Sequence, residues 1–204
     1  MSIIVEHEKR RHEILEKALD IFVDEGFENA TFQKIADKCG ITRTTLYIYF
    51  KNKREIFNFS IKQFLSVLES DIAAIRKMEN ISHTEKLVQV MLSIFESLEK
   101  NRLLLSVVLS YLLHIPKGDN DPDYRVRRRT LRLRHILTAM LVEGINAGEF
   151  TPRLRVKDIN ELLNSFLEAA IFRMVVLRRN TVDEIKDTMK LMLQSFIAEN
   201  NNGV

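Results

Sequence analysis

The chain has 204 residues, a formal net charge of +3 at pH 7, and 46% hydrophobic and 29% charged residues, which is ordinary for a folded protein of one or two domains. Its single cysteine excludes an internal disulfide, and no spacing of Cys and His suits a zinc site. Three prolines and six glycines leave few turns for a β sandwich, whereas good helix formers are abundant, so the composition predicts an all-α fold.

No stretch of the sequence suits a signal peptide or a membrane span. The first residues have no apolar core of the kind that a signal peptide needs. The most apolar run, residues 103–115, is shorter than the roughly 20 residues that cross a bilayer. We therefore expect a cytoplasmic protein with no membrane partner.

Apolar residues at three- and four-residue spacing predict about nine helices. The first covers residues 8–25 and ends at Gly26. Thr31 and Thr42 can each cap the start of a short helix, and Asn52 can cap a long fourth helix. Five further helices are predicted over residues 83–98, 101–114, 122–147, 156–179 and 182–199.

The two short helices and the turn between them have the sequence pattern of a helix-turn-helix. Gly40 supplies the positive φ that such a turn requires. Apolar positions of both helices are spaced to pack against the first helix: Ile35, Ala36, Ile41 and Leu46. The second short helix then presents polar side chains from its N-terminal half, where helices of this motif read base edges: Arg43, Thr44, Thr45 and Tyr47. Residues 31–54, which include both helices, carry six basic side chains against one acidic side chain.

Residues 10–57 closely resemble the DNA-binding domain of TetR-family transcription regulators. The matching positions lie at fixed spacing along this segment: Gly26, Phe27, Thr31, Ile35, Ala36, Gly40, Ile41, Thr42, Thr45, Leu46, Tyr47, Tyr49, Phe50 and Lys53. The resemblance implies an N-terminal three-helix, helix-turn-helix domain over residues 1–55 and a helical ligand-binding and dimerisation domain over residues 56–204. Beyond residue 57 the chain resembles the family only in length and helical character.

The resemblance also implies which residues bind a double-stranded DNA operator. Seven are expected at or near the phosphate backbone: Thr31, Gln33, Lys34, Thr42, Tyr47, Tyr49 and Lys53. Three are expected to face bases, with the arginine suited to guanine: Arg43, Thr44 and Thr45. Phosphate contacts set the register of the protein on DNA, and base contacts set the sequence that it reads. Packing alone is the alternative for the two tyrosines, and a solvated side chain is the alternative for Lys53.

Three positions depart from the family pattern. Thr44 stands where the family often has glycine, Cys39 where it often has alanine, and Arg54 where an acidic residue is common. Thr44 adds a hydroxyl and a methyl group at the DNA groove, so the operator of a relative cannot be transferred to this chain. Cys39 lies on an apolar face, which predicts a buried, inert thiol rather than a redox switch.

Residues 156–179 are apolar on more than one face, so this helix must be covered on two sides. One side can pack within the subunit and the other against a second copy, and the resemblance implies a four-helix interface made by the last two helices of each chain. The expected interface residues are Leu162, Phe166, Ala169, Ala170, Ile185, Met189, Met192 and Phe196. An entirely internal core is the alternative.

The middle helices carry apolar residues that can line a cavity for a hydrophobic or amphipathic inducer, as the resemblance implies. The apolar candidates are Met91, Phe95, Leu104, Val108, Leu112, Met140, Phe166 and Met174, and the polar groups expected near such a cavity are Tyr111, His114 and Arg173. Ordinary core packing is the alternative for each of them. The arginine-rich stretch over residues 125–134 is interpreted as a solvated face, with an anionic ligand, a membrane surface or extra DNA contacts as alternatives.

These features together predict a homodimeric, ligand-responsive regulator that binds a pseudo-palindromic operator, needs no cofactor or metal, and acts as a repressor, with activation left open. An enzyme is disfavoured because the sequence has no Gly-rich phosphate loop, HExxH or GxSxG motif. A helical adaptor for protein partners is the other alternative, and it predicts no salt-dependent affinity for DNA.

Overall fold

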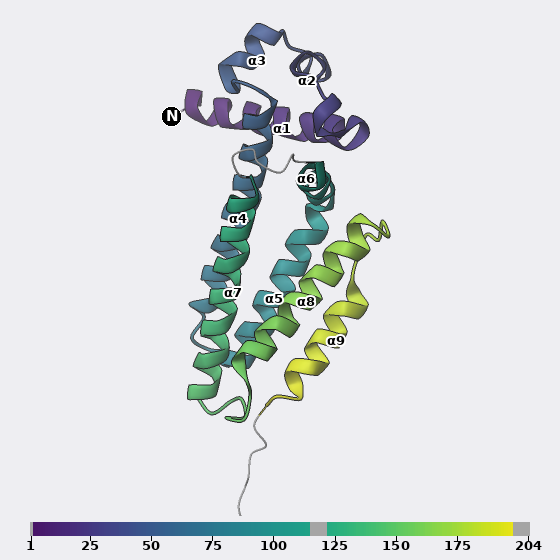
Figure 1. Cartoon of the computed structure of the whole chain (residues 1–204). Helices are drawn as coiled ribbons and strands as arrows, with labels where there is room; N and C mark the ends of the chain where they lie inside the picture. Colours follow the sequence, from purple (N-terminus) through teal and green to yellow (C-terminus); the bar gives the residue numbers. More distant parts are fainter. Residues whose placement is uncertain (1, 115–121, 198–204) are drawn as a thin grey trace, which may run out of the picture. The chain divides into compact units, whose positions relative to one another are not determined.

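The computed structural model describes the backbone of residues 2–114 and 122–197 and the side chains of residues 5–112 and 131–197. Within these ranges the chain has nine helices and no strand beyond an isolated antiparallel bridge between Phe150 and Ile197, so the predicted all-α class is confirmed (Figure 1). The helices are α1 (Ser2–Asn29), α2 (Phe32–Cys39), α3 (Arg43–Tyr49), α4 (Lys53–Arg76), α5 (His83–Lys100), α6 (Arg102–His114), α7 (Pro122–Asn146), α8 (Val156–Val175) and α9 (Asp183–Gln194).

The helices form two compact units. The first unit comprises Met1–Val67 and Asn101–Asp119, and the second comprises Leu68–Lys100 and Asn120–Val204. The first unit therefore contains α1 to α3, most of α4, and α6, although α6 is far from the others in the sequence. The predicted domain boundary between residues 55 and 56 stays a prediction.

Three helices differ in length from the prediction. Helix α1 begins before the predicted residue 8. It has the predicted break at Gly26, where φ is 80° and ψ is 155°, and a further helical turn follows this kink. The end of α8 comes at Val175 because the chain turns through Arg178, whose φ is 53°. Likewise α9 ends at Gln194 instead of residue 199, since the backbone N–H of Thr151 binds the carbonyl of Phe196 at 3.1 Å and draws the chain out of the helix.

One hydrophobic cluster holds the first unit together. Its apolar side chains come from α1 to α4 and from α6, and they include Ile14, Ala18, Ile35, Ala36, Leu46, Phe50, Phe57, Leu104 and Tyr111. The predicted packing of the two short helices on α1 is therefore confirmed. The ring of Tyr111 on α6 lies 4.7 Å from that of Phe27 and 5.1 Å from that of Phe57, measured between centroids, so α6 is part of this core.

In the second unit α5 contacts α7, α8 and α9, and α8 contacts both α7 and α9. Figure 1 shows α8 and α9 running side by side. Two buried asparagines join α8 to α7. Asn160 donates to the carbonyl of Arg134 at 2.7 Å and to the hydroxyl of Thr138, and Asn164 donates to the side-chain oxygen of Asn160 at 2.6 Å. Their polar atoms are thus paired inside an otherwise apolar layer, which buried polar groups require.

Two carboxylates connect distant segments of the second unit. Glu149, in the loop before α8, accepts hydrogen bonds from the backbone N–H groups of His83 and Thr84, each at 2.8 Å, and so caps the start of α5. Glu99, near the end of α5, accepts from the ammonium of Lys186 at 2.8 Å and from the N–H of Val182 at 2.9 Å. The first residues of α5 and of α9 are held by these two side chains.

Candidate nucleic-acid interface

The helix-turn-helix is formed by α2, α3 and the turn at Gly40. Both predicted N-caps are present: the hydroxyl of Thr31 accepts from the N–H of Lys34 at 3.2 Å, and the hydroxyl of Thr42 accepts from the N–H of Thr45 at 3.1 Å. Gly40 has φ 67° and its N–H closes the end of α2. These local bonds fix where α3 begins, which sets the direction in which its side chains point.

Helix α3 is anchored by one face and exposed on the other. Leu46 is fully buried at 0% exposure, whereas Arg43 and Thr44 are exposed and Tyr47 is 49% exposed. The guanidinium of Arg43 donates to the hydroxyl of Tyr47 at 3.1 Å, and the Tyr47 ring lies 4.9 Å from the ring of Phe32 on α2. The exposed face therefore carries an arginine held in place by its neighbour one turn away, which lowers the entropy that a DNA contact would cost.

The other predicted contacts of α2 and α3 already have partners within the unit. The hydroxyl of Thr45 lies 2.9 Å from that of Thr42, and Thr45 is half-buried. Gln33 donates to Asp37 at 2.8 Å, and Lys34 donates to Glu25 on α1 at 2.7 Å. The bonds of Gln33 and Lys34 lie at the exposed surface, where ion pairs and hydrogen bonds exchange at little cost.

Lys53 connects the start of α4 to the turn after α1. Its ammonium donates to the carbonyls of Phe27 and Glu28, both at 2.7 Å, and lies 4.8 Å from the centre of the Phe27 ring. An ammonium has three N–H donors, so these two bonds leave one for a further acceptor. The side chain is half-buried and bonded to the backbone, so it is not the fully solvated lysine that the sequence analysis gave as the alternative.

Two residues of α1 reach the C-terminal end of α3, and the sequence did not single them out. The ring of His7 stacks on Tyr49 with centroids 4.7 Å apart. The guanidinium of Arg11 lies over two rings, 4.8 Å from the centroid of Phe50 and 4.1 Å from that of Phe59. The four-residue spacing of His7 and Arg11 was the available signal, but the predicted helix began at residue 8 and so excluded the first of them.

Cys39 is buried, as predicted, at the end of α2. Burial raises the pKa of its thiol above the usual 9.0, and the nearby positive charges of Lys17 and Arg10 oppose this shift without cancelling it. A thiol with a raised pKa is a weak nucleophile at neutral pH, which fits the predicted inert side chain.

The predicted ligand-lining residues fall into both units. Leu104, Val108 and Tyr111 belong to the hydrophobic cluster of the first unit. Four others are buried in the second unit: Met91, Phe95, Met140 and Met174. Leu112 and Phe166 are half-buried, Arg173 lies 3.8 Å from Glu184, and the side chain of His114 lies outside the described residues, as do those of residues 125–130 in the arginine-rich stretch. Their role at a ligand stays a prediction.

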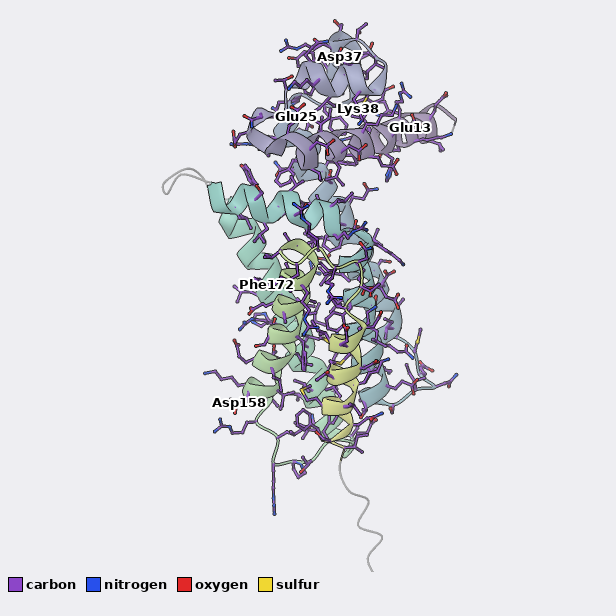
Figure 2. All side chains as sticks on the ribbon, turned by 90° about the vertical axis from the view of Figure 1, so that its right-hand side faces the viewer. Glu13, Glu25, Asp37, Lys38, Asp158 and Phe172 are labelled. Carbon is purple, nitrogen blue, oxygen red and sulfur yellow. The ribbon has the colours of Figure 1, made fainter. Side chains whose placement is uncertain are left out.

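The predicted interface residues divide by exposure. Ala170, Ile185 and Met189 are buried within their own subunit, whereas Leu162 and Ala169 are exposed on α8, and Phe166, Met192 and Phe196 are half-buried. The structure adds large exposed apolar side chains on α8, just after it, and on α9 that were not among the predicted interface residues: Phe172 (Figure 2), Val176, Leu177 and Leu191. The surface formed by Leu162, Ala169 and Phe172 on α8, and by Val176 directly after it, is called the α8 outer face below.

Within the described ranges, no group of three or more His, Cys, Asp or Glu side chains is placed to hold a metal ion. No helix in the same part of the chain is long and apolar enough to cross a bilayer.

Comparison with known proteins identifies the family. Residues 14–58, which include the capped pair α2 and α3, match the family described as bacterial regulatory proteins, tetR family. Residues 84–186 match the family described as tetracyclin repressor-like, C-terminal domain. The chain belongs to the TetR family. The N-terminal match covers the segment whose resemblance the sequence had indicated, and the C-terminal match covers helices for which the sequence offered only length and helical character.

Individual members of the TetR family agree with this assignment. The chain is 30% identical over 148 residues to the HTH-type transcriptional repressor KstR2 of Mycolicibacterium smegmatis, covering 72% of this chain and 70% of that one. It is 25% identical over 163 residues to the fatty acid metabolism regulator protein of Bacillus subtilis, covering 78% and 80%. The solved structure of the ketosteroid transcriptional regulator KstR2 of Mycobacterium tuberculosis has a TM-score of 0.72 at 22% identity, covering 93% and 96%. The chain is a transcription regulator of this family and not an enzyme.

Proposed function

We propose that this TetR-family chain is a homodimeric, ligand-responsive repressor that binds a pseudo-palindromic DNA operator through residues 1–55. The observation that carries the proposal is the two-sided recognition helix: Leu46 is fully buried while Arg43 and Tyr47, bonded to each other, lie on the exposed face. A short helix with one anchored face and a polar exposed face is what a major groove accepts.

We assign base reading to the exposed side chains at the start of α3. Arg43 can donate two hydrogen bonds to guanine, and Thr44 adds a hydroxyl and a methyl group beside it. Thr45 is a weaker candidate, because its hydroxyl already lies 2.9 Å from that of Thr42.

We assign the DNA backbone to side chains around the helix-turn-helix. These are Thr31, Gln33, Lys34, Thr42, Tyr47, Tyr49 and Lys53. The third N–H of Lys53 would meet a phosphate while the other two hold the turn after α1. Such contacts raise affinity for every sequence and set the register of α3 on the duplex.

We propose that a second copy covers the α8 outer face. Phe172 and Val176 are 54% and 53% exposed, and large apolar side chains gathered on one helix face are typical of an interface between subunits. Two copies would present two α3 helices to half-sites about 34–36 Å apart, one turn of DNA. Dimerisation would thus couple the apolar face of the second unit to operator choice.

We propose a hydrophobic or amphipathic small molecule as the inducer, bound within the second domain of a cytoplasmic protein. The buried apolar candidates of α5, α7 and α8 in the second unit support this chemistry, and so do the relatives whose names refer to fatty acid metabolism and to ketosteroids. The ligand would bind more tightly to a state in which the two recognition helices are too far apart to enter both half-sites of the operator. By reciprocity, operator DNA would weaken ligand binding by the same factor.

Fluorescence anisotropy tests the proposal with duplexes from the DNA beside the chain's own gene, each paired with a scrambled duplex. We expect sequence-selective binding of two chains per duplex. If the dimer neutralises six to ten phosphates, affinity falls by about 10³ to 10⁵ between 50 and 200 mM salt. Equally weak, salt-insensitive binding on every duplex would contradict the proposal.

Variants separate base reading from backbone binding in the same assay. Arg43→Ala should flatten the preference at one base pair, at a cost of about 1–3 kcal/mol for the preferred base. Lys53→Ala should weaken binding to selective and scrambled duplexes alike. Arg153→Ala, an exposed arginine of the second unit, is the matched control and should change neither.

A further inference from the structure

The recognition helix carries a second exposed pair of side chains beside Arg43 and Tyr47. Thr44 and Ile48 are also four residues apart, so they are neighbours on the helix surface. Thr44 is exposed, and Ile48 is 67% exposed. The first pair is joined by a hydrogen bond and is polar. The second offers the methyl group of a threonine and the aliphatic chain of an isoleucine.

Folding of the first unit does not explain an isoleucine at position 48. The helix is anchored by Leu46 and continued into the core by Phe50, both essentially fully buried, and Ile48 is absent from the hydrophobic cluster that they join. A β-branched residue is also a poorer helix former than a lysine or glutamine at an exposed position. Covering the exposed part of this side chain after folding would remove apolar surface from water, which is favourable.

The position of Ile48 on α3 places it on the side that would face the bases. Ile48 follows the buried Leu46 by two residues, which is about 200° around a helix, so the two side chains lie on opposite sides of α3. The side opposite the anchored one is the side that enters a major groove. The apolar group that base pairs present there is the C5-methyl of thymine.

We propose that Ile48, with the methyl group of Thr44 beside it, reads thymine by contact with its C5-methyl group. The inference rests on the proposed function, since it requires α3 to lie in the major groove. Two sets of side chains on α3 would then recognise bases in different ways: Arg43 by hydrogen bonds, and Thr44 with Ile48 by apolar contact. The operator should then contain, in each half-site, a thymine whose methyl group is needed for full affinity.

Deoxyuracil scanning tests the proposal with the full-length protein. Each thymine of the selective duplex is replaced in turn by deoxyuracil, which removes the methyl group and keeps the base pair. Loss of one buried methyl contact should lower the affinity about fourfold per half-site at the thymine read by Ile48. The variant Ile48→Ala should bind the thymine duplex more weakly than the wild type and should not respond to deoxyuracil at that position.

Two controls make the result specific. Val67→Ala removes a β-branched side chain, 55% exposed, from the same unit outside α3, and its deoxyuracil profile should match that of the wild type. Ile48→Val retains a methyl group for the contact and should keep part of the response. Circular dichroism of each variant confirms that the helices form.

The outcomes distinguish this inference from the proposed function. If Ile48→Ala and the wild type respond alike to deoxyuracil at every thymine, the thymine contact of Ile48 is wrong, while selective binding by both still supports the regulator. If the wild type selects no duplex over its scrambled partner, the proposed operator binding is overturned, and the thymine contact falls with it.

Discussion

The two compact units differ in how far apart in the sequence their stabilising contacts reach. In the helix-turn-helix the hydrogen bonds that organise the site join residues three or four apart: Thr31 with Lys34, Thr42 with Thr45, and Arg43 with Tyr47. In the second unit the corresponding ties join residues 65 and 87 apart: Glu149 with Thr84, and Glu99 with Lys186. The helix-turn-helix is therefore encoded locally, and the second unit is not.

Helix α6 does not follow this division. Within the sequence it lies in the segment that matches the C-terminal family domain, yet it packs in the first unit, with Tyr111 against Phe27 and Phe57. A change in α6 therefore acts directly on the core that supports α2 and α3.

The largest expected effect comes from a charge on the α8 outer face. Phe172→Glu should raise the dissociation constant of the dimer by a factor of one hundred or more, because an unpaired buried charge costs about 3–5 kcal/mol. Sedimentation equilibrium measures the change, and operator affinity should fall with it. Val142→Glu places the same charge at a 41% exposed position on α7 and should leave the dimer intact. A dimer of unchanged strength in Phe172→Glu would place the interface elsewhere.

The next largest effect should come from the long-range tie between α5 and α9. Glu99 and Lys186 are each only 14% exposed and 2.8 Å apart. Glu99→Gln removes the more buried of the two carboxylates that face the Lys186 ammonium and leaves it only Asp183, at 3.2 Å and 66% exposed. We expect a loss of about 1.5–3 kcal/mol in the free energy of unfolding. Urea denaturation measures this loss.

A double variant and an exposed pair sharpen that measurement. Glu99→Gln combined with Lys186→Met should recover much of the loss, because the partly buried ammonium is then removed together with the carboxylate of Glu99. Asp187→Asn breaks the exposed pair with Lys190, 3.3 Å apart, and should cost well under about 1 kcal/mol. Equal losses of unfolding free energy in Glu99→Gln and Asp187→Asn would mean that burial does not strengthen the ion pair between Glu99 and Lys186.

The sequence could predict the helix-turn-helix because its determinants are local. The caps Thr31 and Thr42, the turn at Gly40 and the buried position of Leu46 all follow from residue type and helical spacing. Spacing could not tell which apolar face of α8 the subunit itself would cover. Ala170 is buried, while Phe172 two residues later is exposed, and only the packing of α8 against its neighbours decides between them.

The same reasoning explains what was missed at the DNA-binding surface. His7 and Arg11 belong to α1, and they contact Tyr49, Phe50 and Phe59. These contacts join residues 39 to 48 apart in the sequence, so the four-residue spacing of His7 and Arg11 could not show what the two side chains would face. Ile48, by contrast, was visible in the sequence, but its 67% exposure was not.

A smaller effect is expected from the local caps of the first unit. Thr42→Ala removes the acceptor of the Thr45 N–H, and Thr31→Ala removes that of Lys34. Each should lower the free energy of unfolding by about 1 kcal/mol. Thr42→Ala should also free the Thr45 hydroxyl and alter the base preference of α3, whereas Thr31→Ala should leave that preference unchanged. Thermal denaturation and the anisotropy assay measure the two effects, and identical preference profiles would contradict a role for Thr42 in placing Thr45.

The smallest effect should appear as a pH dependence of the cap that Glu149 provides to α5. Partial burial opposes ionisation of this carboxyl, but the hydrogen bonds from Thr84 and His83 outweigh it and lower the pKa below the usual 4.5. The stabilisation is therefore complete above that pH and is lost as the pH falls through the lower folded-state pKa. Glu149→Gln keeps one acceptor oxygen, so we expect a loss of about 0.5 kcal/mol in the free energy of unfolding at neutral pH, and this loss should shrink toward zero in acid.

Ser82→Ala is the control. It removes the neutral cap of the same helix, whose hydroxyl lies 3.0 Å from the N–H of Glu85, and its cost should not change with pH. Urea denaturation of both variants over this range decides the point, because a cost of Glu149→Gln that stayed constant into acid would mean that the ionised carboxylate is not what holds α5.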